Sequence, residues 1–385
     1  MAISYETIRG ADVATQTDAV RGDYILGKVA VVKTSPQTVL EDYARLMRML
    51  NYQRILPKAN PTILKINISW DKFYPACSTT PWQLEGVVKT MLEDGYDLRS
   101  LIPAQNRTVV VDAKKGAVAN KHTHVAQKYG FDFVWLWEPS VEWVIYQPQA
   151  EMLVLDKVFP EGITIPKLFI GKNALHMPTM KTHVFTGTTG AMKNAFGGLL
   201  RENRHYTHSV IHETLVDLLA IQREIHPGLF AVMDGSVSGK GPGPRAMEPA
   251  ITNYLLASAD QVAIDAIAAK MMGFDPMSLK FIRLAHERGL GVGDPQEIEV
   301  IGEDISGVNL GYYVGDTFAS WGQKLIYHGV LKPFEKFLLR TPVLQVWSFW
   351  ASHLYYNVFF WTKTGSRRAK EFLEKTEWGQ LFQQY

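Results

Sequence analysis

The chain has a single cysteine, Cys77, among its 385 residues. One thiol cannot form an intramolecular disulfide, and it cannot provide the four thiolates that hold an iron–sulfur cluster. We therefore expect no iron–sulfur cluster held by this chain alone, and the identity of any cofactor stays open. Because no C-x-x-C pair accompanies Cys77, we interpret it as a spectator thiol rather than an activated one. The scarcity of cysteine favours a reducing, cytoplasmic location.

Other absences narrow the class of protein further. The N-terminal segment 1–27 has no apolar stretch of the kind that a secretory signal needs. No block of lysine and arginine occurs and the formal net charge is only +2, so we expect no nucleic-acid partner. The composition, 46% hydrophobic and 20% charged, is that of an ordinary globular protein without repeats. None of these features decides the oligomeric state, so an oligomer is possible.

Apolar, β-branched runs alternate along the chain with segments of helical periodicity. This alternation predicts an α/β fold with a mainly parallel sheet and helices on both faces. Thr80 and Pro81 mark one helix start, as N-cap and first helical residue. The chain is longer than a domain with a single hydrophobic core usually is. We therefore expect an α/β domain over residues 1–309, with a division into two lobes as an alternative, and a helical, aromatic-rich appendage over residues 310–385. Strands are expected at 29–33, 62–68, 107–112, 133–137, 167–170, 229–233 and 297–301, and helices at 81–95, 121–129, 209–225 and 259–272.

Polar residues follow several of the expected strands. Lys65 and Asn67 come at the end of one strand, and Asp234 and Gly235 come at the end of another. The glycine-rich loop SGKGPGPR, residues 238–245, follows directly. Since ligands of parallel sheets bind beyond the carboxyl ends of the strands, we expect these groups to form one rim.

The segment 176–212, HMPTMKTHVFTGTTGAMKNAFGGLLRENRHYTHSVIH, contains five of the eleven histidines. It also has four cations against a single acid, Glu202. Because the whole chain is nearly neutral, this positive charge is local, and it favours a small anionic molecule as the partner. The groups concerned are His176, His183, His205, His208 and His212, with Lys181, Lys193, Arg201 and Arg204.

A glycine- and threonine-rich loop, TGTTGAMKN, occupies residues 186–194 of this segment. Its glycines would turn backbone N–H groups toward a ligand, its threonines would add hydroxyl donors, and Lys193 would add charge at a helix start. The spacing is not that of a Walker A loop. The alternative interpretation is a plain glycine turn with a solvated lysine. The loop residues expected to contact an anion are Thr188, Thr189, Gly190 and Asn194.

The histidines of the segment have several possible roles. On a helix, His205, His208 and His212 would share one face, because they are spaced i, i+3 and i+7. They could then ligate a metal, although no local carboxylate or cysteine completes the set. Acid–base or substrate contact and structural hydrogen bonding are the alternatives. His183 flanks the loop and is the expected proton carrier, and Asp234 would orient a histidine, bind a metal or cap a turn.

Near the C-terminus, residues 341–361 (TPVLQVWSFWASHLYYNVFFW) include no Asp, Glu, Lys or Arg. The length could span a bilayer. Eight aromatic residues and basic flanks, Arg340 and Lys363, better suit the interfacial zone of a membrane. Buried packing or an oligomer contact is the alternative.

Five motifs, in this order, resemble the domain of unknown function 362 family: KTHVFTGTTGAMKNAFG, RENRH, MDGSVSGKGPGP, LASADQVAIDAIAAKMMGFDP and GLGVGD. The resemblance covers residues 62–303 and implies an α/β fold, without implying a reaction. Two features depart from the family pattern. The ferredoxin-like cysteine clusters of some relatives are absent, so no electron-transfer role is implied, and the usual Lys-Pro-Asn appears as Lys65-Ile66-Asn67. The signature positions of the family match Lys181, His183, Gly190, Lys193, Asn194, Gly197, Asp234, Gly235, Asp260 and Asp265.

We therefore expect an enzyme of open reaction class that binds an anionic, partly hydrophobic small molecule, in the cytoplasm or peripherally on the inner membrane face. Proton transfer would use His183, Lys193, His205 and Asp234 as catalytic groups. One alternative is a metal-dependent enzyme built on the late histidines, and another is a non-catalytic, membrane-associated binding protein. The expected substrate-binding residues are Lys65, Asn67, Lys181, Thr188, Thr189, Gly190, Asn194, Arg201 and Arg204.

Overall fold

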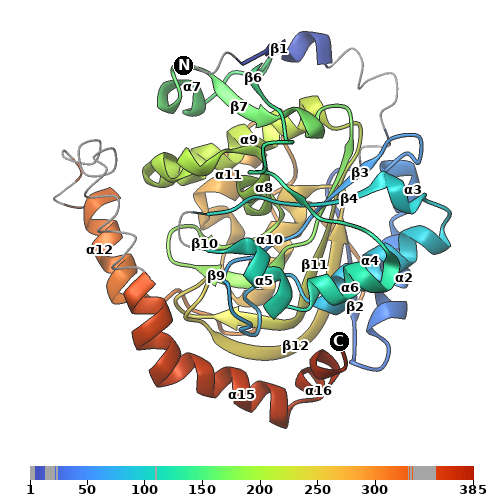
Figure 1. Cartoon of the computed structure of the whole chain (residues 1–385), viewed down its shortest axis with the longest axis vertical. Coiled ribbons are helices and arrows are strands. Elements are labelled where there is room, and N and C mark those ends of the chain that lie inside the picture. Colours follow the sequence, from blue (N-terminus) through green and yellow to red (C-terminus); the bar gives the residue numbers. More distant parts are fainter. Residues whose placement is uncertain are drawn as a thin grey trace.

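The computed structural model describes residues 5–13, 22, 25–108, 111–327, 329, 332 and 353–385. In these residues, ten strands form one mixed sheet in which most neighbouring strands run parallel (Figure 1). This confirms the predicted α/β fold with a mainly parallel sheet. The strands, in sheet order, are β13 (Glu299–Gly302), β2 (Lys28–Lys33), β12 (Glu248–Ser258), β11 (Leu229–Lys240), β8 (Asn173–His176), β3 (Thr62–Lys65), β4 (Leu101–Gln105) and β5 (Val134–Trp135), with β9 (Thr179–His183) beside β11 and β10 (Gly187–Thr188) beside β9.

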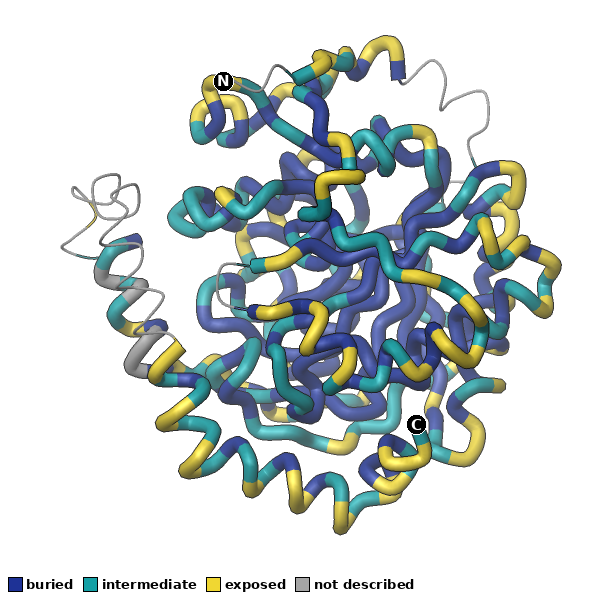
Figure 2. The backbone as a smooth tube through the Cα atoms, viewed as in Figure 1, coloured by how far each residue is buried: buried dark blue, intermediate teal, exposed yellow. Residues whose placement is uncertain are grey.

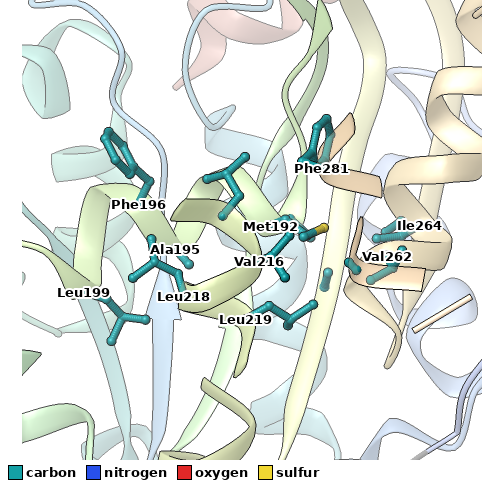
Figure 3. Packing of buried hydrophobic residues seen from close by; sticks show 14 of the residues in the cluster. Met192, Ala195, Phe196, Leu199, Val216, Leu218, Leu219, Val262, Ile264 and Phe281 are labelled. Atoms are coloured by element: carbon teal, nitrogen blue, oxygen red, sulfur yellow. The ribbon is translucent and has the colours of Figure 1, made fainter. Parts of the chain in front are cut away.

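Successive residues of the central strands point to opposite faces of the sheet. Val29 and Val31 of β2 join one hydrophobic cluster, whereas Ala30 and Val32 join another. Figure 3 shows part of the first cluster, where buried side chains from neighbouring helices meet, among them Met192, Val216, Ile264 and Phe281. Helices therefore cover both faces, as predicted. The first face is covered by α8 (Ala191–Leu199), α9 (Ile211–Ile225), α10 (Gln261–Met272) and α11 (Lys280–Glu287), and the second by α2 (Val39–Met49), α3 (Tyr52–Ile55), α4 (Pro81–Glu93), α5 (Ala113–Ala119) and α6 (His122–Tyr129).

The helix starts follow the local sequence. Thr80 caps α4, because its hydroxyl accepts a hydrogen bond from the Gln83 N–H at 3.2 Å, and Pro81 is the first helical residue, as predicted. Asp260 caps α10 in the same way, accepting from the N–H groups of Val262 and Ala263. A second, three-stranded sheet lies at the top of Figure 1 and consists of β1 (Thr7–Arg9), β6 (Trp143–Gln147) and β7 (Ile163–Pro166), with α7 (Leu155–Val158) nearby.

The strands β11 and β12 form a long antiparallel hairpin inside the sheet. β11 continues to Lys240, well beyond the expected end at Met233. Gly235 fits within the strand because a Cβ there would approach the Tyr254 carbonyl oxygen to 2.9 Å. Glycine has a low strand propensity, so pairing with β12 rather than local preference sustains this part of the strand. Asp234 therefore lies within a strand and not at its end.

Two of the expected strands were wrong. Among the described residues of 107–112, only Thr108 and Val111 pair, as an isolated β-bridge. The strand that joins the sheet is β4, which ends just before this segment. Lys167–Phe169 form a 3-10 turn, and the strand begins only at Asn173, as β8. The sequence of β8, NALH, has no β-branched residue. It is a strand because it is buried between β3 and β11, and this tertiary context outweighs propensity.

The C-terminal region packs against the second face of the main sheet. Trp378 lies 5.0 Å from Trp82, centroid to centroid, and its indole N–H donates to Asn253 Oδ1. Phe382 stacks on Phe73 at 3.9 Å. Figure 2 shows this region with its outer turns exposed and its inner turns buried. It consists of α12 (Phe318–Tyr327), the π-helix η6 (Leu354–Gly365), α15 (Ser366–Lys375) and α16 (Glu377–Gln384).

The membrane prediction for 341–361 falls partly outside the described residues, which resume at residue 353. Among the helices described, none has the length and apolar character needed to cross a bilayer. In η6, Tyr356 is buried, whereas Leu354, Val358 and Phe359 are 45–49% exposed. The helix thus has one face packed on the protein and one apolar face exposed.

Candidate functional site

A cavity of about 280 Å³ lies where the chain leaves β3, β4 and β8. Lys65 ends β3, Gln105 ends β4, and β9 begins shortly after β8. Parallel strands place their carboxyl ends at one edge of a sheet, so loops far apart in sequence meet there. The helix α8, the 3-10 helix η3 (Glu202–Val210) and the C-terminal elements α12 and η6 complete the wall.

Most of the predicted site residues line this cavity together. The exceptions are Asp234, Thr188 and Arg201, with His212 from the metal alternative. Pro244 and Arg245 contribute from the predicted 238–245 loop. The predicted residues that line the cavity are Lys65, Asn67, Lys181, His183, Thr189, Gly190, Lys193, Asn194, Arg204 and His205, with His208 from the metal alternative.

Two of the cavity lysines are buried and bonded to neutral oxygens. The ammonium of Lys65, 1% exposed, donates to the Ile66 carbonyl oxygen and to Gln105 Oε1. The ammonium of Lys181, 2% exposed, donates to the Cys77 carbonyl oxygen and to the Ser69 hydroxyl. These bonds satisfy the N–H groups but do not neutralise the charges.

Two more cations, Lys193 and Arg204, lie over one aromatic ring. Lys193 Nζ is 5.6 Å and Arg204 Cζ is 5.9 Å from the centroid of Phe196. Arg204 is buried and donates to the carbonyl oxygens of Arg107 at 2.6 Å and Arg201 at 3.0 Å. Lys193 makes no hydrogen bond or ion pair with the described residues. Its ammonium is therefore available to a ligand.

The cavity has little negative charge to balance these cations. Glu202 is the single acidic side chain among its described lining residues, and Arg107 binds the Glu202 carboxylate. Burial lowers the pKa of all four cations, and repulsion by neighbouring cations lowers the pKa of Lys65 and Lys193 further. The pKa falls to about 7 for Lys65 and Lys193, to about 8 for Lys181 and to about 10 for Arg204.

Hydrogen bonds fix the tautomers of two cavity histidines. His183 Nδ1 accepts from the Phe185 N–H at 3.2 Å, so the neutral ring carries its proton on Nε2. His208 Nδ1 donates to the His205 carbonyl oxygen at 3.0 Å, so its Nε2 holds a lone pair. Burial lowers the pKa of His208 to about 4 and that of His183 well below its ordinary value. At neutral pH, His183 thus offers a donor and His208 an acceptor.

The glycine loop is built differently from the expected anion-binding loop. The first N–H groups of α8, from Ala191 and Met192, donate to the Asp265 carboxylate at 2.6 and 3.1 Å. Gly190 is required there because a Cβ would lie 1.9 Å from Asp265 Oδ1. Thr186 and Thr189 donate their hydroxyls to backbone carbonyl oxygens. These backbone N–H groups and hydroxyls are therefore already bonded within the protein, and side chains provide the positive charge of the cavity.

Two asparagines and a glycine shape the surroundings of the cavity lysines. Asn67 Nδ2 donates to the Cys77 carbonyl oxygen at 3.1 Å, and Asn194 Nδ2 donates to that of Lys65 at 2.7 Å. A Cβ at Gly198 would lie 2.9 Å from Lys65 Cε. The glycines of α8 therefore leave room for the buried lysine stem.

Three predicted residues have other surroundings. Asp234 is fully buried, and its carboxylate accepts from Thr80, from the Trp82 indole N–H and from Ser236, away from the cavity histidines. Arg201 donates to the Tyr5 hydroxyl and lies over Trp143, beside a separate pocket. Thr188 is buried in β10.

The metal alternative finds no support in the described part of the chain. His212 packs on Phe281, with ring centroids 6.0 Å apart, and does not line the cavity. The described residues contain no group of three or more His, Cys, Asp or Glu side chains placed to hold a metal ion. Cys77 is buried, donates to the Pro244 carbonyl oxygen, and has its pKa raised by burial, which agrees with a spectator thiol.

The sequence reasoning missed an apolar wall on one side of the cavity. Phe185 lies between His183 and the glycine loop, and its ring is 5.7 Å from both His208 and Tyr327. His208 stacks on Tyr327 at an interplanar angle of 15°. The aromatic richness of 341–361 was a signal for Tyr356 but gave no indication that it would face the site. The C-terminal residues in the wall are Ile326, Tyr327 and Tyr356.

The fold and the cavity define an α/β protein with a strand-end pocket that is lined by cations and by apolar side chains. The chain belongs to the family described as domain of unknown function DUF362, whose profile matches residues 62–270, more than half of the sequence. The match includes all the predicted site residues. No curated protein and no solved structure matches the chain.

Proposed function

We propose that this protein is an enzyme that binds a small anion with an apolar portion and moves protons on it. One observation carries the proposal: Lys65, Lys181, Lys193 and Arg204 converge on one cavity whose described walls offer no unpaired carboxylate. Uncompensated buried charges each cost several kcal/mol. A bound anion would compensate these charges.

The other side of the cavity selects for apolar character. Phe185, Ile326, Tyr327 and Tyr356 line it, and three of these come from the C-terminal region. Burying a ligand's CH₂ group contributes about 0.8 kcal/mol. A carboxylate or phosphate that carries an alkyl or aryl group can contact both the cations and the apolar side chains, whereas an inorganic ion can contact only the cations.

Two histidines of opposite hydrogen-bonding character support proton transfer. His183 presents Nε2–H and His208 presents an Nε2 lone pair, and both line the cavity. A ligand between them can receive a hydrogen bond on one atom and lose a proton from another. The neighbouring Lys193 can carry the proton away, because a pKa of about 7 lets it change protonation state readily.

Thermal unfolding with a ligand series tests the proposal. Octanoate and octyl phosphate should each stabilise the protein, by about 2.7 kcal/mol at a concentration 100 times the Kd. Acetate and inorganic phosphate should stabilise it less, and octylammonium should not stabilise it. Lys193→Met should weaken the effect, whereas Lys172→Met, a half-buried lysine outside the cavity, should retain it. Equal stabilisation by octylammonium and octanoate would refute an anion site.

A further inference from the structure

Lys193 differs from the other two cavity lysines in its bonding. Lys65 and Lys181 each donate to a carbonyl oxygen and to a second oxygen, and these bonds hold each Nζ in place. Lys193 has no such bond within the described part of the chain. Its Nζ is therefore free to approach a bound molecule.

The surroundings of Lys193 favour the neutral amine. Burial and the charges of Lys181 and Arg204 disfavour a positive charge on Nζ, and these effects outweigh the attraction of the ammonium to the Phe196 ring beneath it. A desolvated lysine beside other cations is the arrangement that turns the amine into a nucleophile at neutral pH. With a pKa of about 7, the neutral fraction at pH 7 is on the order of a thousand times that of an ordinary lysine.

We propose that Lys193 is a catalytic nucleophile that forms an imine with the carbonyl carbon of an oxo acid carrying an apolar chain. This inference rests on the proposed function, because Lys181 and Arg204 would hold the carboxylate of the substrate. The apolar chain would lie against Phe185 and Tyr327. The substrate class is thus a 2-oxo or 3-oxo carboxylic acid.

The step balances without an oxidant or reductant. The amine lone pair forms a C–N bond, the C–O bond breaks, and the carbonyl oxygen leaves as water with one proton from the nitrogen and one from solvent, which leaves the imine protonated. His183 Nε2–H can donate to the carbonyl oxygen, and His208 Nε2 can accept a proton from the nitrogen. The protonated imine withdraws electrons from the adjacent carbon, which eases removal of a proton or loss of a 3-carboxylate.

Reductive trapping tests this proposal on the full-length protein. We would incubate it with 2-oxooctanoate or pyruvate and sodium borohydride, and then map the modified peptide by mass spectrometry. We expect one stable adduct, on Lys193, formed faster with 2-oxooctanoate, and a trapping rate that is half-maximal near pH 7. Lys193→Met should lose the adduct, and Lys172→Met should keep it.

Each other outcome overturns a defined part of the reasoning. An adduct on Lys65 or Lys181 instead of Lys193 refutes the assignment of the nucleophile, and peptide mapping of the wild-type chain shows this even if a variant fails to fold. No adduct with either oxo acid, while octanoate still stabilises the protein, refutes imine formation but leaves the anion site in place. No adduct and no stabilisation by octanoate refutes both proposals.

Discussion

Replacing Lys193 with methionine should stabilise the ligand-free protein. Methionine retains most of the apolar stem but removes the ammonium, which lies near Lys181 and Arg204 without a bonded partner in the described residues. Substituting Lys65 should not give this gain, since its ammonium satisfies the Ile66 carbonyl oxygen and Gln105. Loss of that ammonium would leave two buried acceptors unsatisfied.

The size of the effect follows from the pKa of Lys193, which falls from its ordinary value of 10.5 to about 7. At 1.36 kcal/mol per pKa unit, the full shift corresponds to roughly 5 kcal/mol. Because Lys193 is only partly buried, we discount this figure for solvent screening and expect roughly 2–3 kcal/mol. With an unfolding entropy of about 2.1 cal/mol/K per residue, this raises the Tm by roughly 2–4 °C.

The pH dependence gives the sharper test. The folded pKa lies below the unfolded pKa, so the unfolded state binds more protons between about pH 7 and 10.5. The penalty from Lys193 is full below pH 7 and disappears as the pH rises through this window. The Tm gap between Lys193→Met and wild type should therefore be widest at pH 6.5 and shrink by pH 9.5.

Differential scanning calorimetry at the two pH values checks this, with Lys115→Met, a 76% exposed lysine on α5, as the control. The control should shift the Tm little at either pH. A Lys193→Met protein that melts at or below the wild-type Tm at pH 6.5 would refute the reasoning, as would a gap that does not shrink at pH 9.5.

Three further outcomes follow from the same structure. Octanoate affinity should fall as the pH rises from 7 to 10, because the cavity lysines lose their protons, and calorimetric titration at three pH values would show it; a constant affinity would contradict the charge argument. Gly190→Ala should destabilise the protein by more than about 3 kcal/mol, because the Cβ would collide with the buried Asp265 carboxylate; an unchanged denaturation midpoint would contradict this contact. The full-length chain should sediment with anionic vesicles through the exposed Leu354, Val358 and Phe359, and a triple serine variant should sediment less; equal sedimentation would count against a membrane role for this face.

Much of the fold could be predicted from the sequence because local signals and burial agree there. The β-branched run of β2 is strand-forming and buried, and Thr80-Pro81 starts α4 as local capping chemistry requires. The run 107–112 has equally good local signals, but neighbouring strands pair with β4 instead. β8 shows the reverse, since its residues have weak strand preference and only their position between two strands makes them one.

The candidate site divides along similar lines. Lysines, histidines and glycines clustered in 176–212 indicated where the cavity lies, because charge and conformational freedom are properties of the residue types themselves. The glycine loop looked like an anion cradle, but Asp265, far along the chain, occupies its N–H groups. The sequence of the loop itself contains no signal that its N–H groups bind a residue of α10.

The sequence by itself determined the strand-and-helix alternation, the local excess of positive charge and the presence of a single cysteine, since each follows from residue type and spacing. Only the tertiary structure decided which charges are uncompensated, because that depends on what lies opposite each side chain. In the folded chain, Lys65 and Lys181 donate to carbonyl oxygens, whereas the ammonium of Lys193 remains available to a ligand. Asp234 binds Thr80 and Trp82 and lies away from the cavity histidines. The tertiary structure also brought Tyr356, from the far end of the chain, into the cavity wall.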